Sequence, residues 1–167
     1  GMLFRERHCL HVSTAIVFNH ESPRRGPQFV TQKVVQGLVR IQQGKQDVLE
    51  LGNLTAVKDW GFAPEYVDGL IRMAELDQPE DFILATGKKN TVEDLVRVTA
   101  DVLQLNWQDV VRTRDGLVRQ NVSDTPLVGD PSKANKLLGW EAKTDLKQLV
   151  ELMVRAELEG DLGVGFE

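Results

Sequence analysis

Apolar and polar positions alternate along this chain with two different periods. Residues 12–18 form an apolar run rich in β-branched side chains that ends at Asn19, a pattern typical of a buried strand. The apolar residues between Phe29 and Ile41 then follow the spacing of an amphipathic helix, which we expect to end at Gly44. The alternating segment 47–51 predicts a half-exposed strand.

Three further apolar runs are short and are predicted to be strands. They cover residues 57–60, 82–85 and 110–113, and the last is the weakest of the three. Strands therefore alternate with helical patterns along the chain. This order is typical of an α/β fold with parallel strands.

A second helix is predicted to open at Pro64 and to end before Pro79, since proline is favoured at the first helical position and cannot continue a helix. Its apolar residues lie on one face of that helix, which we expect to be buried. They are Val67, Leu70, Ile71 and Ala74.

The remaining helices are predicted from their first and last residues. Thr91 with Asp94 three positions on is close to a capping box. Asp130 and the following proline open a short helix that ends at Gly139. The last helix is expected to start at Thr144 and to pack its apolar residues inward.

Composition limits the classes of protein to which the chain can belong. With 167 residues, 41% of them apolar, it can bury one core but has little room for two full domains. The net charge of -5 argues against nucleic acid as a partner. No apolar run approaches the roughly 18 residues of a membrane span, so we expect no membrane partner and a cytoplasmic location. The single cysteine, Cys9, excludes a disulfide framework and is expected to be a small buried thiol.

The polar string that follows the first apolar run carries the most chemistry. Residues 19–26 read Asn-His-Glu-Ser-Pro-Arg-Arg-Gly. Open α/β sheets bind ligands at the carboxyl ends of their strands, so this string predicts a loop that binds an anion or a nucleotide. The guanidinium fork of Arg25 suits a phosphate. The alternative is that Arg24 and Arg25 form a solvated basic turn and that His20 is an ordinary loop residue.

This string belongs to a set of blocks that closely resembles the GDP-mannose 4,6-dehydratases, which are extended short-chain dehydrogenases/reductases. The blocks occur in the same order as in the family and cover nearly the whole chain. Besides residues 19–26 they are Leu-Gly-Asn-Leu at 51–54, Asp-Trp-Gly at 59–61, Ile-Leu-Ala-Thr-Gly at 83–87, Gly-Asp-Pro-Ser-Lys-Ala at 129–134 and Leu-Gly-Trp at 138–140.

Two motifs of that family are absent from this sequence. It contains no G-x-G-x-x-G turn for a cofactor pyrophosphate, and its only tyrosine, Tyr66, is not followed by the lysine of Tyr-x-x-x-Lys. The resemblance therefore implies the C-terminal portion of such an enzyme, lacking most of the Rossmann domain.

The implied fold is α/β and forms one unit over residues 1–167. A remnant of a Rossmann-type sheet is expected over about residues 1–27. The small mixed α/β substrate-binding domain is expected over about residues 28–160, and a tail over residues 161–167.

The resemblance also implies a reaction and a set of ligand contacts. In the family, NADP takes a hydride from C4 of GDP-mannose and returns it to C6, which gives GDP-4-keto-6-deoxymannose. His20 and Arg25 match the positions that contact NADP. Asn19, Lys33, Lys58 and Arg119 match those that contact the sugar nucleotide. The family's catalytic side chains have no counterpart here, so we expect no activity from the chain alone and no tightly bound NADP.

Departures from the family pattern keep other interpretations open. Lys58 stands where most members have arginine, Gln120 replaces a proline after Arg119, and the family's ribose-binding glutamate has no clear counterpart. The alternative for Lys33 is an ordinary solvated lysine. Two alternatives stay open: the chain derives from a GDP-4-keto-6-deoxymannose reductase or another sugar-nucleotide epimerase, or it is a non-catalytic nucleotide-sugar binding or assembly module. In each case we expect a homo-oligomer, because an apolar first strand needs cover.

Overall fold

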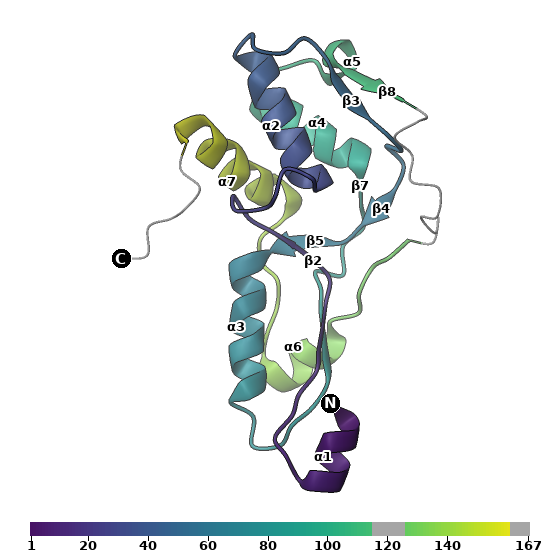
Figure 1. Ribbon diagram of the computed structural model, residues 1–167, viewed down its shortest axis with the longest axis vertical. Helices are drawn as coiled ribbons and strands as arrows, with labels where there is room; N and C mark the ends of the chain where they lie inside the picture. Colours follow the sequence, from purple (N-terminus) through teal and green to yellow (C-terminus); the bar gives the residue numbers. More distant parts are fainter. Residues whose placement is uncertain (115–125, 161–167) are drawn as a thin grey trace.

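The computed structural model describes residues 1–114 and 126–160, and within them helices alternate with short strands (Figure 1). The helices are α1 Met2–His8, α2 Val30–Gln42, α3 Ala63–Ala74, α4 Val92–Val102, α5 Trp107–Val110, α6 Ser132–Leu138 and α7 Leu146–Glu159. The strands are β1 Ala15–Val17, β2 Asn19–Glu21, β3 Leu49–Leu51, β4 Val57–Lys58, β5 Trp60–Phe62, β6 Phe82–Leu84, β7 Asn90–Thr91 and β8 Val111–Thr113.

The segment that contains β1 and β2 changes its strand partner at Phe18. β1 pairs in parallel with β6, and the Phe18 amide extends that ladder by donating to the Leu84 carbonyl at 2.9 Å. β2 then pairs in parallel with β5, with Asn19 opposite Trp60. β3 and β8 form a third parallel pair, and β4 pairs antiparallel with β7. Parallel strands joined through helices confirm the predicted α/β class.

Two hydrophobic clusters lie on either side of the β2–β5 pair. The first lies among α2, α4 and α7, where Val34, Val35 and Leu38 are fully buried (Figure 1). Gly37 lets β3 pack against α2, because a Cβ at this position would lie 2.7 Å from Leu49 Cδ1. This cluster therefore holds the middle of α2 against the first residue of β3.

The second cluster packs α3 and α6 against β6, with half-buried side chains of β1 beside them. Its centre is Trp140, whose ring meets the Tyr66 ring edge to face with centroids 5.5 Å apart. The indole Nε1 also donates to the Glu65 carbonyl at 2.7 Å. This cluster combines Ala15 with residues as distant as Ala142. The predicted boundary near residue 27, between the sheet remnant and the substrate-binding domain, stays a prediction.

The predicted face of α3 is wrong. Val67, Leu70 and Ile71 are 53%, 42% and 52% exposed, whereas Tyr66 and Met73 point into the second cluster. Gly69 lies on the inward face too, where a Cβ would come within 3.0 Å of Trp140 Nε1. This face turns inward because the tyrosine, glycine and methionine on it accommodate the large indole of Trp140. The apolar periodicity of the helix alone does not reveal this.

Three other predictions need correction. The first strand is only three residues long and is not buried, since Ile16 is 55% exposed. The segment before it, for which the sequence predicted no helix, begins with α1. Cys9 is exposed rather than buried, because it takes the left-handed conformation, with φ of 51°, that ends this helix.

Predicted helix ends agree better with the structure. The capping box of Thr91 and Asp94 is present, and Gly139 ends α6 in the left-handed conformation. The last helix begins at Leu146, two residues later than predicted, after a capping box between Asp145 and Gln148. These ends depend on neighbours a few residues away, so the sequence specifies them locally.

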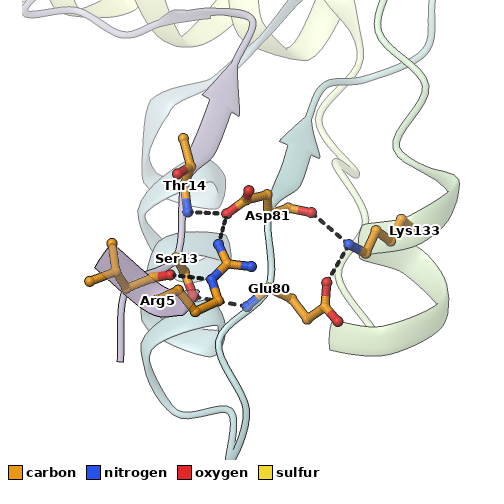
Figure 2. A network of polar contacts seen from close by, with 7 residues as sticks. Arg5, Ser13, Thr14, Glu80, Asp81 and Lys133 are labelled. Atoms are coloured by element: carbon orange, nitrogen blue, oxygen red, sulfur yellow. Dashed lines mark hydrogen bonds and ion pairs between the residues drawn. The ribbon is translucent and has the colours of Figure 1, made fainter. Parts of the chain in front are cut away.

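Figure 2 shows how the amino-terminal end of β6 is tied to α1 and α6. The Asp81 carboxylate accepts from the Thr14 amide at 2.9 Å and forms an ion pair with Arg5. Lys133 of α6 donates to Glu80 at 2.7 Å and to the Asp81 carbonyl at 2.8 Å. The bond from Thr14, followed by those from Arg5, lowers the pKa of Asp81. This network lies at the end of β6 opposite to the candidate site.

Candidate functional site

Asn19 and His20 lie in a strand, not in the predicted loop. Their backbones pair with Trp60 and Gly61 of β5, so the motif extends the sheet beyond the apolar run instead of leaving it. The loop begins only at Ser22, and the Arg25 amide donates to its carbonyl at 2.9 Å. The correction matters because a strand fixes the directions of Asn19 and His20 more firmly than a loop does.

The His20 ring is held by two contacts. Nδ1 lies 2.9 Å from the Phe18 carbonyl oxygen, which can only accept, so Nδ1 carries the hydrogen. The ring also stacks on Tyr66 with centroids 5.5 Å apart and an interplanar angle of 30°. In the neutral ring Nε2 is then an acceptor that can meet a donor on a ligand.

Tyr66 itself belongs to the core. Tyr66 is 1% exposed. Desolvation raises its pKa most, and the nearby carboxylates, first among them Asp59, raise this pKa further. A general base needs a pKa near neutrality. The raised pKa therefore makes Tyr66 a poor general base.

Glu21 is buried beneath the motif. Its carboxylate accepts from Thr31 Oγ1 at 2.6 Å and lies 3.0 Å from Arg25 Nε. Desolvation nevertheless raises the pKa of Glu21 above its ordinary value of 4.5, and the hydrogen bond from Thr31 and the charge of Arg25 offset only part of this effect. Sequence reasoning gave Glu21 no role.

This buried carboxylate has a consequence for stability. Because its folded-state pKa is raised, the native chain binds more protons than the unfolded chain from pH 4.5 up to that raised pKa, and the free energy of unfolding falls as the pH rises through this window. We expect Glu21→Gln to reduce this fall, measured by urea unfolding at pH 4.5 and 7.5. Glu141→Gln, at an exposed position, is the control. The same pH slope in wild type and in Glu21→Gln would contradict the assignment.

Arg25 and Lys33 lie along one side of the start of α2. The Arg25 guanidinium lies 3.5 Å from the centroid of the Phe29 ring, and the Lys33 amide donates to the Phe29 carbonyl one turn further on. Lys33 Nζ donates to the Glu50 carbonyl at 2.8 Å, and Arg114 reaches the Glu50 carboxylate at 3.0 Å. The predicted Lys33 is thus at the end of β3, next to a further cation that sequence reasoning did not name.

Lys58 lies on β4, opposite Asn90 of β7. Within residues 1–114 and 126–160, its ammonium group makes no hydrogen bond or ion pair. Because Asn19 pairs with Trp60, only two residues beyond Lys58, these two predicted residues lie on adjoining segments. The predicted Arg119 lies outside the described residues.

Asp59, next to Lys58, is a buried carboxylate that sequence reasoning did not single out. It is 1% exposed and accepts four hydrogen bonds, from Thr86, Gly87 and Gly129. These donors come from the turn after β6 and from the segment before α6. The only signal in the sequence was its place in the Asp-Trp-Gly block.

A groove of about 390 Å³ lies beside these residues, between β7, α4 and the start of α7. Its wall includes Trp60, Thr86 and the cations Lys88, Lys89 and Lys147. The described residues contain no cluster of potential metal ligands. None of the helices described is long and apolar enough to cross a bilayer.

Comparison with known proteins identifies the family. The family model for GDP-mannose 4,6 dehydratase matches residues 2–153. GDP-mannose 4,6 dehydratase 1 of Arabidopsis thaliana is 42% identical over 156 residues, which cover 93% of this chain and 43% of that protein.

Solved structures agree in fold. RMD from Pseudomonas aeruginosa complexed with NADPH superposes with a TM-score of 0.82 at 17% identity, covering 95% of this chain and 51% of that one. UDP-glucose 4-epimerase from Thermotoga maritima with UDP-glucose superposes with a TM-score of 0.76 at 22% identity, covering 95% and 50%. These two superpositions confirm the predicted α/β fold class. The chain belongs to the GDP-mannose 4,6-dehydratase family and spans about half the length of the curated relatives that it matches.

Proposed function

We propose that this chain forms the sugar-nucleotide-binding part of a GDP-mannose 4,6-dehydratase that acts in the cytoplasm. Asn19, Lys33, Lys58 and Arg119 form the proposed nucleotide-sugar site. The observation that carries this proposal is the register of β2 and β5, because it brings Asn19 next to the segment of Lys58, whose ammonium group has no protein partner in the part of the chain described. A lysine whose ammonium has no partner among the described residues suits the diphosphate of GDP-mannose, and the side-chain amide of Asn19, on the adjoining segment, suits its sugar hydroxyls.

For the cofactor, we propose that His20 and Arg25 contact one edge of NADP. The acceptor Nε2 of His20 supports this role, since its ring is already oriented by Phe18 and Tyr66. Arg25 fits less well, because its Nε faces Glu21 and its guanidinium covers Phe29. With no glycine-rich turn in the sequence, these two residues cannot enclose a dinucleotide, so we expect no tight binding of NADP by the chain alone.

The nucleotide-sugar site predicts weak but measurable affinity for GDP-mannose. Half a cleft buries less of the ligand than a whole one, so we expect a Kd between micromolar and millimolar, roughly −8 to −4 kcal/mol. Lys58→Ala and Arg119→Ala each remove a cation that the proposal assigns to the diphosphate, and we expect each to weaken binding about tenfold. Calorimetric titration of GDP-mannose into the three proteins measures this.

Two controls make the titration decisive. Lys136→Ala, on α6 and at an exposed position, removes the same charge away from the site and should leave the affinity unchanged. Titration with UDP-glucose tests whether the site distinguishes the base of the nucleotide sugar. If UDP-glucose binds as tightly as GDP-mannose, the epimerase alternative is favoured. Equal affinity for GDP-mannose in wild type, Lys58→Ala and Arg119→Ala would remove both residues from the site.

We also propose that the chain associates with itself. Among the described residues, an apolar surface is exposed on α3 and on β1, including Val67, Ile71 and Ile16, each more than half exposed. Within residues 1–114 and 126–160, β1 has β6 as its one strand partner. Exposed apolar surface and a free strand edge favour association. Light scattering over a concentration series should give a mass above that of one chain, and Val67→Glu should lower it. A constant monomer mass in wild type at high concentration would contradict this.

A further inference from the structure

The Asp59 carboxylate joins three segments that are distant in sequence. Its Oδ1 accepts from the Thr86 amide at 2.9 Å and from Thr86 Oγ1 at 2.6 Å. Its Oδ2 accepts from the Gly87 amide at 3.0 Å and from the Gly129 amide at 3.2 Å. A carboxylate that is 1% exposed must find such donors, because burying it unpaired costs several kcal/mol. Its four bonds thus tie β4 and β5 to the turn after β6 and to the segment before α6.

The segments that Asp59 ties together also pack without space between them. At Gly129, a Cβ would lie 2.3 Å from the Cβ of Ala85 and 2.9 Å from the Phe18 ring. Gly87 has φ of 72°, a conformation that glycine adopts without strain. Phe18 directly precedes Asn19. The packing around Asp59 therefore reaches both strands that carry the proposed nucleotide-sugar site.

Lys58 is the last residue of β4, and Asp59 is the single residue between β4 and β5. Consecutive side chains of an extended chain point to opposite sides. Because the Asp59 side chain is fixed inward by four bonds, the Lys58 side chain is directed to the other side. The cross-strand pair of Lys58 with Asn90 places the same backbone at a fixed distance from β7.

We infer that Asp59 is a positioning residue, which holds the backbone of Lys58 in the place where its ammonium meets the diphosphate of the nucleotide sugar. The inference deepens the proposed function and rests on it. Asp59 itself does not touch the ligand in this account, since its carboxylate is enclosed by protein donors.

The effect of Asp59→Asn on affinity separates positioning from simple electrostatics. Removing a negative charge next to Lys58 would by charge alone strengthen the binding of an anionic ligand. The carboxamide, however, turns its NH2 toward amides that donate, because it has one acceptor oxygen where Asp59 has two. Positioning therefore predicts weaker binding, and charge predicts tighter binding.

The experiment measures GDP affinity and amide exchange in Asp59→Asn, Lys58→Ala and the double variant. We expect Asp59→Asn to weaken GDP binding about tenfold and to speed exchange of the Gly87 or Gly129 amide about tenfold. In the double variant, Lys58→Ala should cost much less affinity than it does in wild type, because the lysine is already misplaced. Thr86→Val, which removes only the hydroxyl bond, should change both readouts in the same direction but less. This milder variant gives the answer if Asp59→Asn does not fold.

Other outcomes overturn the inference. A role in stability alone would lower the melting temperature of Asp59→Asn and leave the GDP affinity of the folded protein unchanged. Additive effects of the two substitutions would show that Asp59 does not act through Lys58. Glu80→Gln removes a carboxylate at the far end of β6 and should change neither readout. If wild type does not bind GDP, the proposed function fails. Amide exchange that is unchanged in Asp59→Asn at Gly87, Gly129 and the Lys58–Asn90 pair would separately refute the positioning role of Asp59.

Discussion

Purified chain incubated with NADP and GDP-mannose should form no 4-keto sugar at an enzymatic rate. The sequence has no Tyr-x-x-x-Lys and no glycine-rich turn, and its one tyrosine is buried with a raised pKa. Loss of a general base alone costs about 10²–10⁴-fold in rate, and loss of the cofactor's hydride chemistry costs more. The measurement is the appearance of the 4-keto product over hours.

The control for this experiment is the complete Arabidopsis relative under identical conditions. Addition of a separate polypeptide that carries the missing motifs should restore turnover if the two parts assemble. Formation of the 4-keto sugar by the chain alone, at a rate near that of the relative, would contradict this account of which residues are required.

Trp140→Ala should have the largest effect on stability of any single substitution discussed. The indole is 1% exposed, contacts Tyr66 edge to face and donates to the Glu65 carbonyl. Truncating a buried tryptophan typically costs about 3–5 kcal/mol, a large share of the roughly 5–15 kcal/mol that stabilises a domain. Urea unfolding followed by circular dichroism measures the loss.

The matched control is Trp107→Ala, because this ring is only half-buried against the first cluster. We expect it to cost clearly less than Trp140→Ala. Equal losses for the two variants would mean that the second cluster is not organised around Trp140. Gly69→Ala provides a further check, since its new Cβ would crowd the indole and Leu84.

Features of the fold that depend on neighbouring residues were predictable from the sequence, whereas features that depend on distant residues were not. The capping box at Thr91 and the left-handed Gly139 were predictable, because each depends on residues within a few positions. The inward face of α3 was not, because it is set by Trp140, a residue more than 60 positions away from the helix. The amphipathic pattern of Val67 to Ala74 describes this helix correctly as a helix but assigns its exposed side as the buried one.

The candidate site was predictable in part, from the family resemblance and not from local sequence patterns. The resemblance to a family supplied Asn19, His20, Arg25, Lys33, Lys58 and Arg119. It did not supply Asp59 or Glu21, since their roles arise from donors brought together by folding. The end of the apolar run predicted a loop for the motif of Asn19, because the strand that pairs with this motif, β5, lies about 40 residues further along the chain.

The central claim is that a nucleotide sugar binds where β2, β4 and the start of α2 meet. Titration of ¹⁵N-labelled chain with GDP-mannose, followed by amide chemical shifts, tests it most directly. The account predicts saturable shifts at Asn19, Lys33 and Lys58, and smaller ones in the Lys58→Ala variant. Shifts confined to the groove at Lys88, Lys89 and Lys147, or no shifts at millimolar GDP-mannose, would contradict it.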